Sequence, residues 1–311
     1  MSLKLSQTDK SGTPIASVRK SDGKFSGQVL YLDSDGSAAT SGGSPEIDAQ
    51  MFARLTPGVK PVERMRKLTR IQDALDRQKP SLLKEPDEKE LYETLLKSQE
   101  ADRSIHLPDG NEFSVLPNAD ANGRDVIYIT GQSGSGKSYF CRNFMESYHK
   151  LFPDRKIYLI SYLDSDETLD NSKTLFKRIK MADYIEDPLD HDDFKNALLI
   201  ADDYDQLPKK ELKATQELLD KCVSMGRHSH CSILACLHRP TDYKNTKLLL
   251  CESQKMVIYP NSMTPYALDY LCKEYIGIPR GEVAKIKRLG RWVCFNKSPK
   301  WILSSHCAKL M

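Results

Sequence analysis

Eight residues beginning at Gly131 have the types and spacing of a phosphate-binding loop. They read Gly131-Gln132-Ser133-Gly134-Ser135-Gly136-Lys137-Ser138, directly after an apolar run at 126–129 and before a stretch whose apolar residues have helical spacing. This fits GxxxxGK[ST] in the context of strand before and helix after, where backbone N–H groups cradle phosphates. The pattern predicts that the chain binds a nucleoside triphosphate.

Each residue type in this loop has a chemical reason. Glycine reaches backbone conformations closed to residues with a Cβ, so successive N–H groups can turn inward around the phosphates. We expect Lys137 to reach the β- and γ-phosphates and the Ser138 hydroxyl to ligate Mg²⁺. Tyr139 starts the following helix and completes the predicted nucleotide-binding set. A chance Gly/Ser-rich turn is the alternative, against which the order of strand, Lys-Ser pair and helix argues.

A second apolar run, 197–201, ends in the two carboxylates Asp202 and Asp203. We expect Asp202 to hold Mg²⁺ through its water shell and Asp203 to orient or activate the attacking water. A second acid favours hydrolysis over nucleotide storage. An acidic cap or turn before the next helix is the alternative, since Asp is common there, and Asp205 could compete with Asp203.

The segment 226–240 reads GRHSHCSILACLHRP, an apolar strand with a polar residue at each end. His238 would lie at the rim of a sheet, where it could sense the γ-phosphate. Arg227 could face a nucleotide in its own subunit or in a neighbouring one as an arginine finger. Each has a structural alternative, because a lone rim histidine is often structural and an arginine in a turn is usually solvated.

Composition narrows the class of protein. The chain has 311 residues, 39% hydrophobic and 29% charged, with a formal charge of +3, so overall charge does not indicate nucleic acid. The N-terminus lacks a signal-peptide core and no apolar run reaches the roughly 20 residues of a membrane span, so we expect a soluble intracellular protein. The eight cysteines include no CxxC pair, which favours reduced, buried thiols over a zinc site or disulfides.

The first 103 residues differ from the rest. Residues 1 to about 60 are rich in Ser, Gly, Asp and Thr, especially 33–44, and predict a partly disordered arm with brief strands such as 28–32. Charged helical segments follow from 62 to 99, interrupted at Pro80 and Pro86. The expected domains are therefore 1–103, of unknown function, and 104–311. A hairpin of 104–107 with 113–116 is expected to open the second domain.

From there strands and helices alternate. We expect five strands, at 126–130, 156–161, 197–201, 232–237 and 255–259, with helices at 137–150 and 209–225 among the connections. This alternation predicts an α/β fold with a mainly parallel sheet flanked by helices. Ligands of such sheets lie at the carboxyl ends of the strands, where the glycine-rich loop falls.

Together these motifs resemble the FtsK–HerA superfamily of P-loop ATPases, and within it the poxvirus-type DNA-packaging ATPases of nucleo-cytoplasmic large DNA viruses. The resemblance rests on GQSGSGKSYF, FPDRKIYLIS, LLIADDYD, GRHSHCSILACLHRP, EYIGIPRGEVAKI and RWVCFNKSPKWIL, in that order between about 105 and 303. Many members carry Gln where His238 stands. The resemblance implies a RecA-like fold of the additional-strand type, with a C-terminal helix and β-hairpin.

It also implies a motor: ATP and Mg²⁺ as cofactors, self-association into a ring, usually a hexamer, and translocation of double-stranded DNA, in a virus into the capsid. Lys137, Asp203, Arg227 and His238 are then the expected catalytic residues. A viral member would work in the host cytoplasm or nucleus, or in the virion, with capsid proteins as partners. Residues 255–300 include nine basic and three acidic residues. The basic residues could contact DNA phosphates or form a solvated face.

Two other classes remain open at this point. A P-loop kinase would need an Arg-rich lid and an acceptor pocket, neither of which the sequence indicates. A nonenzymatic switch or scaffold would bind ATP without turnover.

Overall fold

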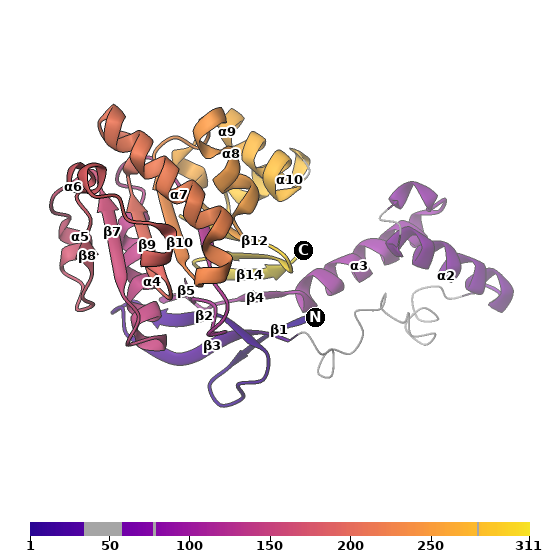
Figure 1. The fold of residues 1–311 in the computed structure, drawn as a ribbon. Coiled ribbons are helices and arrows are strands. Elements are labelled where there is room, and N and C mark those ends of the chain that lie inside the picture. The colour runs from indigo at the N-terminus through magenta and orange to yellow at the C-terminus, as the bar shows by residue number, and fades with distance from the viewer. Residues whose placement is uncertain (34–57, 77–78, 279) are drawn as a thin grey trace.

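The computed structural model describes residues 1–33, 58–76, 79–278 and 280–311 (Figure 1). The Ser- and Gly-rich part of the expected arm, 34–57, lies outside the described residues. No helix in the described ranges combines the length and the apolar character needed to cross a membrane.

A ten-stranded sheet forms the centre of the molecule. Six of its strands are parallel, in the spatial order β11-β6-β10-β9-β7-β8. They are β6 (Val126–Thr130), β7 (Ile157–Ser161), β8 (Lys177–Arg178), β9 (Leu198–Asp202), β10 (Ser232–Leu237) and β11 (Lys255–Ile258). The five predicted strands are all present, and β10 lies between β6 and β9, as the additional-strand type requires.

Four antiparallel strands extend this sheet beyond β11. They follow in the order β12, β13, β14 and β4, and span Val293–Lys297, Lys300–Ser304, Cys307–Leu310 and Ser104–His106. The hairpin β12–β13 and the preceding helix α10 (Arg280–Ile286) confirm the predicted C-terminal helix and hairpin.

Helices cover both faces of the sheet, because its strands are apolar at successive positions and are buried on both sides. One face carries α6 (Met181–Glu186), α7 (Lys209–Ser229), α8 (Tyr243–Glu252), α9 (Pro265–Leu271) and α10. The other carries α4 (Lys137–Leu151) and α5 (Glu167–Asp170). Shorter helical turns are η2 (His191–Phe194), η3 (Tyr204–Gln206), η4 (Pro260–Ser262) and the π-turn η5 (Cys272–Ile276). The two predicted helices of this part are confirmed as α4 and α7.

A second, four-stranded sheet corrects the expectation of a disordered arm for residues 2–33. Its order is β1-β3-β2-β5, all antiparallel, from Ser2–Ser6, Phe25–Asp33, Thr13–Lys20 and Asn111–Val115. Ile15, Val18 and Leu30 are buried in one apolar cluster with Phe144 of α4. Short runs of apolar residues among Ser and Lys thus suffice for strands, and residues 2–33 pack with the P-loop domain instead of extending from it.

The predicted hairpin of 104–107 with 113–116 is wrong. Strand β4 pairs with β14 in the large sheet, and β5 pairs with β2 in the small one. The turn between them therefore crosses from one sheet to the other, because each strand has a better partner elsewhere than its neighbour in sequence.

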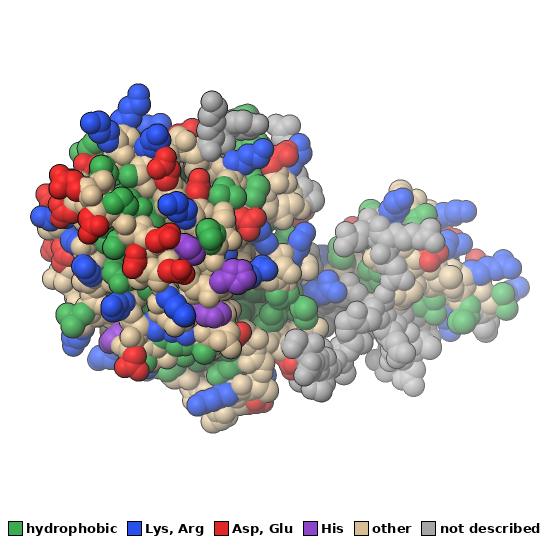
Figure 2. Space-filling model, viewed as in Figure 1, with side chains coloured by type: hydrophobic (Ala, Val, Ile, Leu, Met, Phe, Trp, Pro, Cys, Tyr) green, Lys and Arg blue, Asp and Glu red, His purple; other side chains and the backbone are tan. Residues whose placement is uncertain are grey.

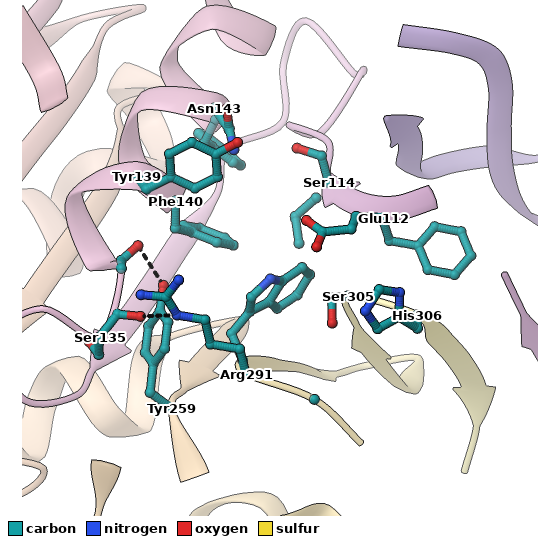
Figure 3. A pocket seen from close by; sticks show the side chains of 16 residues that line it. Glu112, Ser114, Ser135, Tyr139, Phe140, Asn143, Tyr259, Arg291, Ser305 and His306 are labelled. Carbon is teal, nitrogen blue, oxygen red and sulfur yellow. Dashed lines mark hydrogen bonds between the residues drawn. The ribbon is translucent and has the colours of Figure 1, made fainter. Parts of the chain in front are cut away.

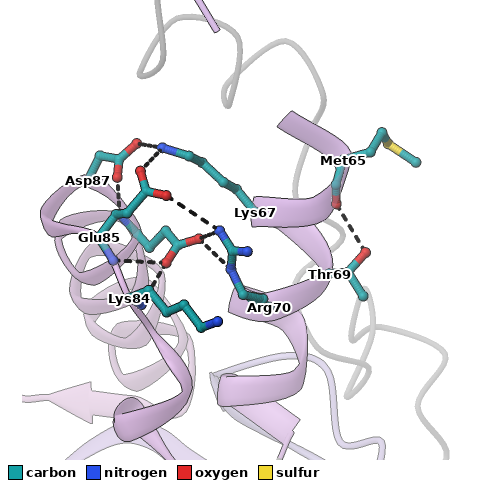
Figure 4. Close-up of polar contacts among 8 residues, drawn as sticks. Met65, Lys67, Thr69, Arg70, Lys84, Glu85 and Asp87 are labelled. Atoms are coloured by element: carbon teal, nitrogen blue, oxygen red, sulfur yellow. Dashed lines mark hydrogen bonds and ion pairs between the residues drawn. The ribbon is translucent and has the colours of Figure 1, made fainter. Parts of the chain in front are cut away.

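The two charged helical segments predicted between 62 and 99 are present, and they form a separate helical hairpin that stands out to one side in Figure 1. Helices α2 (Pro61–Asp76) and α3 (Pro86–Asp102), joined through η1 (Pro80–Leu82), enclose a small core of their own. The buried Lys67 ammonium binds Asp87 and Glu85 at 2.6 Å each (Figure 4), and these hydrogen bonds raise its pKa. Arg70 pairs with the buried Glu88. Paired charges therefore fix the helices against each other.

Candidate nucleotide site

The glycine-rich loop lies at the carboxyl edge of the parallel strands. It begins where β6 ends, and Thr130 is in register with Leu237 at the end of β10. Gly134 and Gly136 have φ values of 73° and 114°, which residues with a Cβ rarely adopt. Gly136 caps the N-terminus of α4. The free N–H groups of that helix end face the space above the loop, which suits an anion such as phosphate.

Lys137 is 4% exposed and its ammonium lies between the loop and Asp203. Its Nζ donates to the carbonyl of Gly131 at 2.9 Å and lies 3.2 Å from Asp203 Oδ1. The fold thus brings the P-loop lysine and the second acid after β9 into one ion pair.

Ser138 and Asp202 meet as the sequence predicted. The Ser138 hydroxyl donates to Asp202 Oδ2 at 2.9 Å. The other carboxylate oxygen, Oδ1, is buried with no hydrogen-bond partner in the part of the chain that the structure describes. Burial, and next the charge of Asp203, raise the pKa of Asp202 to about 6. A buried carboxylate oxygen without a partner costs free energy, and together with a hydroxyl it offers the oxygen ligands that Mg²⁺ prefers. These two residues therefore fit a magnesium ion.

Asp203 lies between Lys137 and His238. Its Oδ2 is 3.4 Å from His238 Nε2, and its backbone is left-handed with φ 50°. This conformation is uncommon outside Gly, although Asp tolerates it better than most residues, and such strain clusters at functional sites. The carboxylate is about a quarter exposed, so water can reach it.

Asp205 binds the backbone after β10, unlike Asp203, which lies beside Lys137. Its Oδ2 accepts from the backbone N–H groups of His238 at 3.1 Å and Arg239 at 3.2 Å. It therefore holds the chain just after β10 and so places His238 at the sheet rim, where the sequence predicted it. Of the two acids, Asp203 is the one that lies beside Lys137.

Arg227 is not part of this constellation. It is exposed in the last turn of α7, just before β10 begins, whereas the P-loop is level with the end of β10. The five steps from Ser232 to Leu237 place it about 17 Å or more from the loop along the strand. The fold excludes the expectation that it reaches the nucleotide of its own subunit.

Two residues that sequence reasoning missed support the loop from outside. Arg291, between α10 and β12, donates from Nε to Ser135 O at 2.8 Å (Figure 3). Its Nη2 donates to Gly134 O at 3.0 Å. The Tyr259 hydroxyl donates to Gly136 O at 2.7 Å. Tyr259 follows β11 at the carboxyl edge of the sheet, which was a usable signal. For Arg291 there was no signal in the sequence beyond its place in a basic segment.

A cavity of about 210 Å³ opens beside the loop. Its walls come from the loop, the first turns of α4, strand β5 and the segment before β12, so that Tyr139, Trp292, Arg291 and Glu112 surround it (Figure 3). Tyr139 is half exposed at its rim. Aromatic surfaces beside a carboxylate and a guanidinium suit a flat heterocycle that carries polar groups.

The basic C-terminal segment is less available than its composition suggested. Lys255 forms an ion pair with the buried Asp125, Lys297 donates to the carbonyls of Leu250 and Cys251, and Arg291 holds the loop. Lys273, Lys285, Arg288 and Lys300 are exposed, and of these Lys273 pairs with Glu274 and Lys285 with Glu282. On the face in Figure 2, basic and acidic side chains are interspersed.

A P-loop preceded by a parallel strand, with Ser138, Asp202 and Asp203 around it, defines a P-loop NTPase fold. The chain belongs to the same family as uncharacterized protein V3 of Sputnik virophage: the two are 32% identical over 219 residues, which is 69% of this chain and 87% of that protein. No protein-family model matches the chain.

Two solved structures are similar to parts of the chain. One is the genome packaging NTPase B204 from Sulfolobus turreted icosahedral virus 2 in complex with AMPPCP, at 16% identity and a TM-score of 0.41, covering 59% of this chain and 97% of that one. The other is the pCW3 conjugation coupling protein TcpA with ATPγS, at 12% identity and a TM-score of 0.42, covering 65% of each chain.

Proposed function

We propose that this protein is a Mg²⁺-dependent ATPase that translocates double-stranded DNA and packages a viral genome. The observation that carries the proposal is the contact of four predicted residues from two separate segments: Ser138 with Asp202, and Lys137 with Asp203. The sequence resemblance to packaging ATPases and the membership of a virophage protein family support the viral context.

The chemistry follows from the positions of these groups. With triphosphate in the loop, the Lys137 ammonium turns from Asp203 toward the β- and γ-phosphates. Ser138 and Asp202 would hold Mg²⁺, which would neutralise charge on the phosphate oxygens. Asp203 would then be free to accept a proton from the attacking water, with His238 beside it. Tyr139 and Trp292 would line the space for the nucleoside.

DNA contact is proposed for the exposed basic residues Lys273, Lys285, Arg288 and Lys300, which would meet phosphates without reading sequence. In a ring, Arg227 on the far edge of the sheet would face the nucleotide of a neighbouring subunit, and the site would be complete only at a subunit border.

The test is ATP hydrolysis by the full chain, with and without linear double-stranded DNA. We expect hydrolysis that needs Mg²⁺ and rises with DNA, and its loss in Lys137→Ala. The matched control is Lys213→Ala, which removes an exposed lysine of α7. A folded protein that binds ATP without turnover would instead be a nucleotide switch, and turnover that DNA leaves unchanged would remove translocation from the proposal.

A further inference from the structure

Two cysteines meet directly beneath the P-loop. Cys141 lies on α4, one helical turn after Lys137, and Cys236 lies on β10, beside β6. Their Sγ atoms are 3.2 Å apart, and both side chains are fully buried. The residues are 95 positions apart in sequence, so no spacing motif could have indicated the pair.

A carboxylate completes the group. Asp202 follows Ala201, which is in register with Ala235 of β10, so Asp202 lies beside Cys236 on the face covered by α4. One ligand atom from each of Cys141, Cys236 and Asp202 lies within 4.8 Å of the others. Among the described residues this is the one such group of three that could hold a metal ion.

A buried cysteine alone is an ordinary core residue. This pair differs because Asp202 lies beside it. Asp202 is only 2% exposed, and its Oδ1 atom has no hydrogen-bond partner among the described residues. Two sulfurs bound to one tetrahedral Zn²⁺ stand about 3.8 Å apart, given metal–sulfur bonds of about 2.3 Å. The two sulfurs, observed 3.2 Å apart, therefore need to separate by only about 0.6 Å more to bind one ion.

We propose that Cys141, Cys236 and Asp202 form a binding site for a thiophilic divalent cation such as Zn²⁺ or Cd²⁺. On binding, both thiols lose their protons to solvent and two metal–sulfur bonds form, with no change of oxidation state. The carboxylate supplies the third ligand and leaves a fourth position for water.

A metal ion at this site would also affect the binding of Mg²⁺ and nucleotide, an inference that rests on the proposed function. Asp202 is the carboxylate assigned to Mg²⁺, and two divalent cations held by this one carboxylate would repel each other. A thiophilic ion therefore competes with Mg²⁺ and nucleotide, and by linkage each weakens the other by the same factor.

The experiment titrates the reduced full chain with Cd²⁺ and follows the ultraviolet absorption of cadmium thiolate. We expect one Cd²⁺ per chain, and affinity lowered about 100-fold in Cys236→Ser and in Asp202→Asn. The matched control is Cys307→Ser, which removes another buried thiol, the one near His106 Nε2. Its affinity should equal that of the unmodified chain.

Equal affinity in Cys236→Ser, or a loss in Cys307→Ser instead, would overturn the site. X-ray absorption of the wild-type Cd²⁺ complex does not depend on how well a variant folds: two sulfur ligands support the site, and one or none contradicts it. Adding Mg²⁺ with a nonhydrolysable ATP analogue should weaken Cd²⁺ binding. Binding that depends on Cys236 but ignores Mg²⁺ and nucleotide would retain the thiol site and contradict the magnesium role of Asp202.

Discussion

The guanidinium of Arg291 donates to the carbonyl of Ser135 at 2.8 Å, across 156 residues of sequence. A second hydrogen bond, at 3.0 Å, reaches Gly134. The loop needs its N–H groups turned inward for phosphate, which turns carbonyls outward, and Arg291 binds two of these. The C-terminal segment thus holds the P-loop in a phosphate-ready conformation from its outer side.

Arg291→Ala should therefore weaken ATP binding more than it slows turnover. Loss of two charge-assisted hydrogen bonds is expected to raise the Kd for ATP about tenfold. Arg291→Lys should recover only part of this, since a single ammonium cannot reproduce the forked contact. The measurement is the Kd of a fluorescent ATP analogue, together with kcat and KM.

The control for this prediction is Arg103→Ala, an exposed arginine away from the loop. A fall in kcat at unchanged Kd would show that Arg291 acts on the chemical step and not on the shape of the loop.

The contacts of Arg291 could not be predicted from the sequence, whereas the strands around the P-loop could. The strands around the P-loop could be predicted because a buried parallel strand leaves a continuous apolar run, and carboxylates at the end of such a run must lie at one sheet edge. Asp202, Asp203 and His238 were predicted at this edge in this way, and Lys137 and Ser138 from the glycine-rich motif.

Residues that reach the site through tertiary packing leave no such signal. The bonds of Arg291, the pairing of Cys141 with Cys236 and the small N-terminal sheet all depend on partners distant in sequence. The expected hairpin of 104–107 with 113–116 failed for the same reason, because local turn chemistry was outweighed by strands available elsewhere.

Asp203→Asn should separate binding from hydrolysis. Asn tolerates the left-handed backbone at this position, so the loop should keep its shape, while the amide cannot accept the proton of water. We expect kcat to fall about 100-fold with ATP affinity nearly unchanged. Single-turnover hydrolysis and equilibrium binding of ATP measure the two effects. An unchanged kcat would remove Asp203 as the base.

The raised pKa of Asp202 predicts how stability depends on pH. In the unfolded chain this carboxyl has its ordinary value of 3.8, against about 6 when folded. Between these values the folded state holds a proton that the unfolded state has released, so the free energy of unfolding falls as pH rises through this window. Without Mg²⁺ and nucleotide, Asp202→Asn should be the more stable protein at pH 7, by up to about 3 kcal/mol.

Urea unfolding at several pH values tests this, with the exposed Asp109→Asn as the control. The stability difference between wild type and Asp202→Asn should grow from acid to neutral pH, and that of Asp109→Asn should not. A difference independent of pH would mean that folding does not raise the pKa of Asp202.

The position of Arg227 gives a prediction about assembly. If the proposed ring forms, each site takes Lys137 from one subunit and Arg227 from its neighbour, because the sheet separates the two within a chain. Lys137→Ala and Arg227→Ala proteins should then each be inactive alone. In a mixed ring, an Arg227→Ala subunit retains Lys137 and receives Arg227 from a Lys137→Ala neighbour, so mixing the two inactive proteins should restore ATP hydrolysis in proportion to such borders.

Arg227→Lys, which keeps the charge but not the forked guanidinium, is the matched variant and should complement poorly. Activity in Arg227→Ala alone would show that this arginine has no part in the site. No recovery in mixtures that form rings would contradict its contribution to the site of a neighbouring subunit.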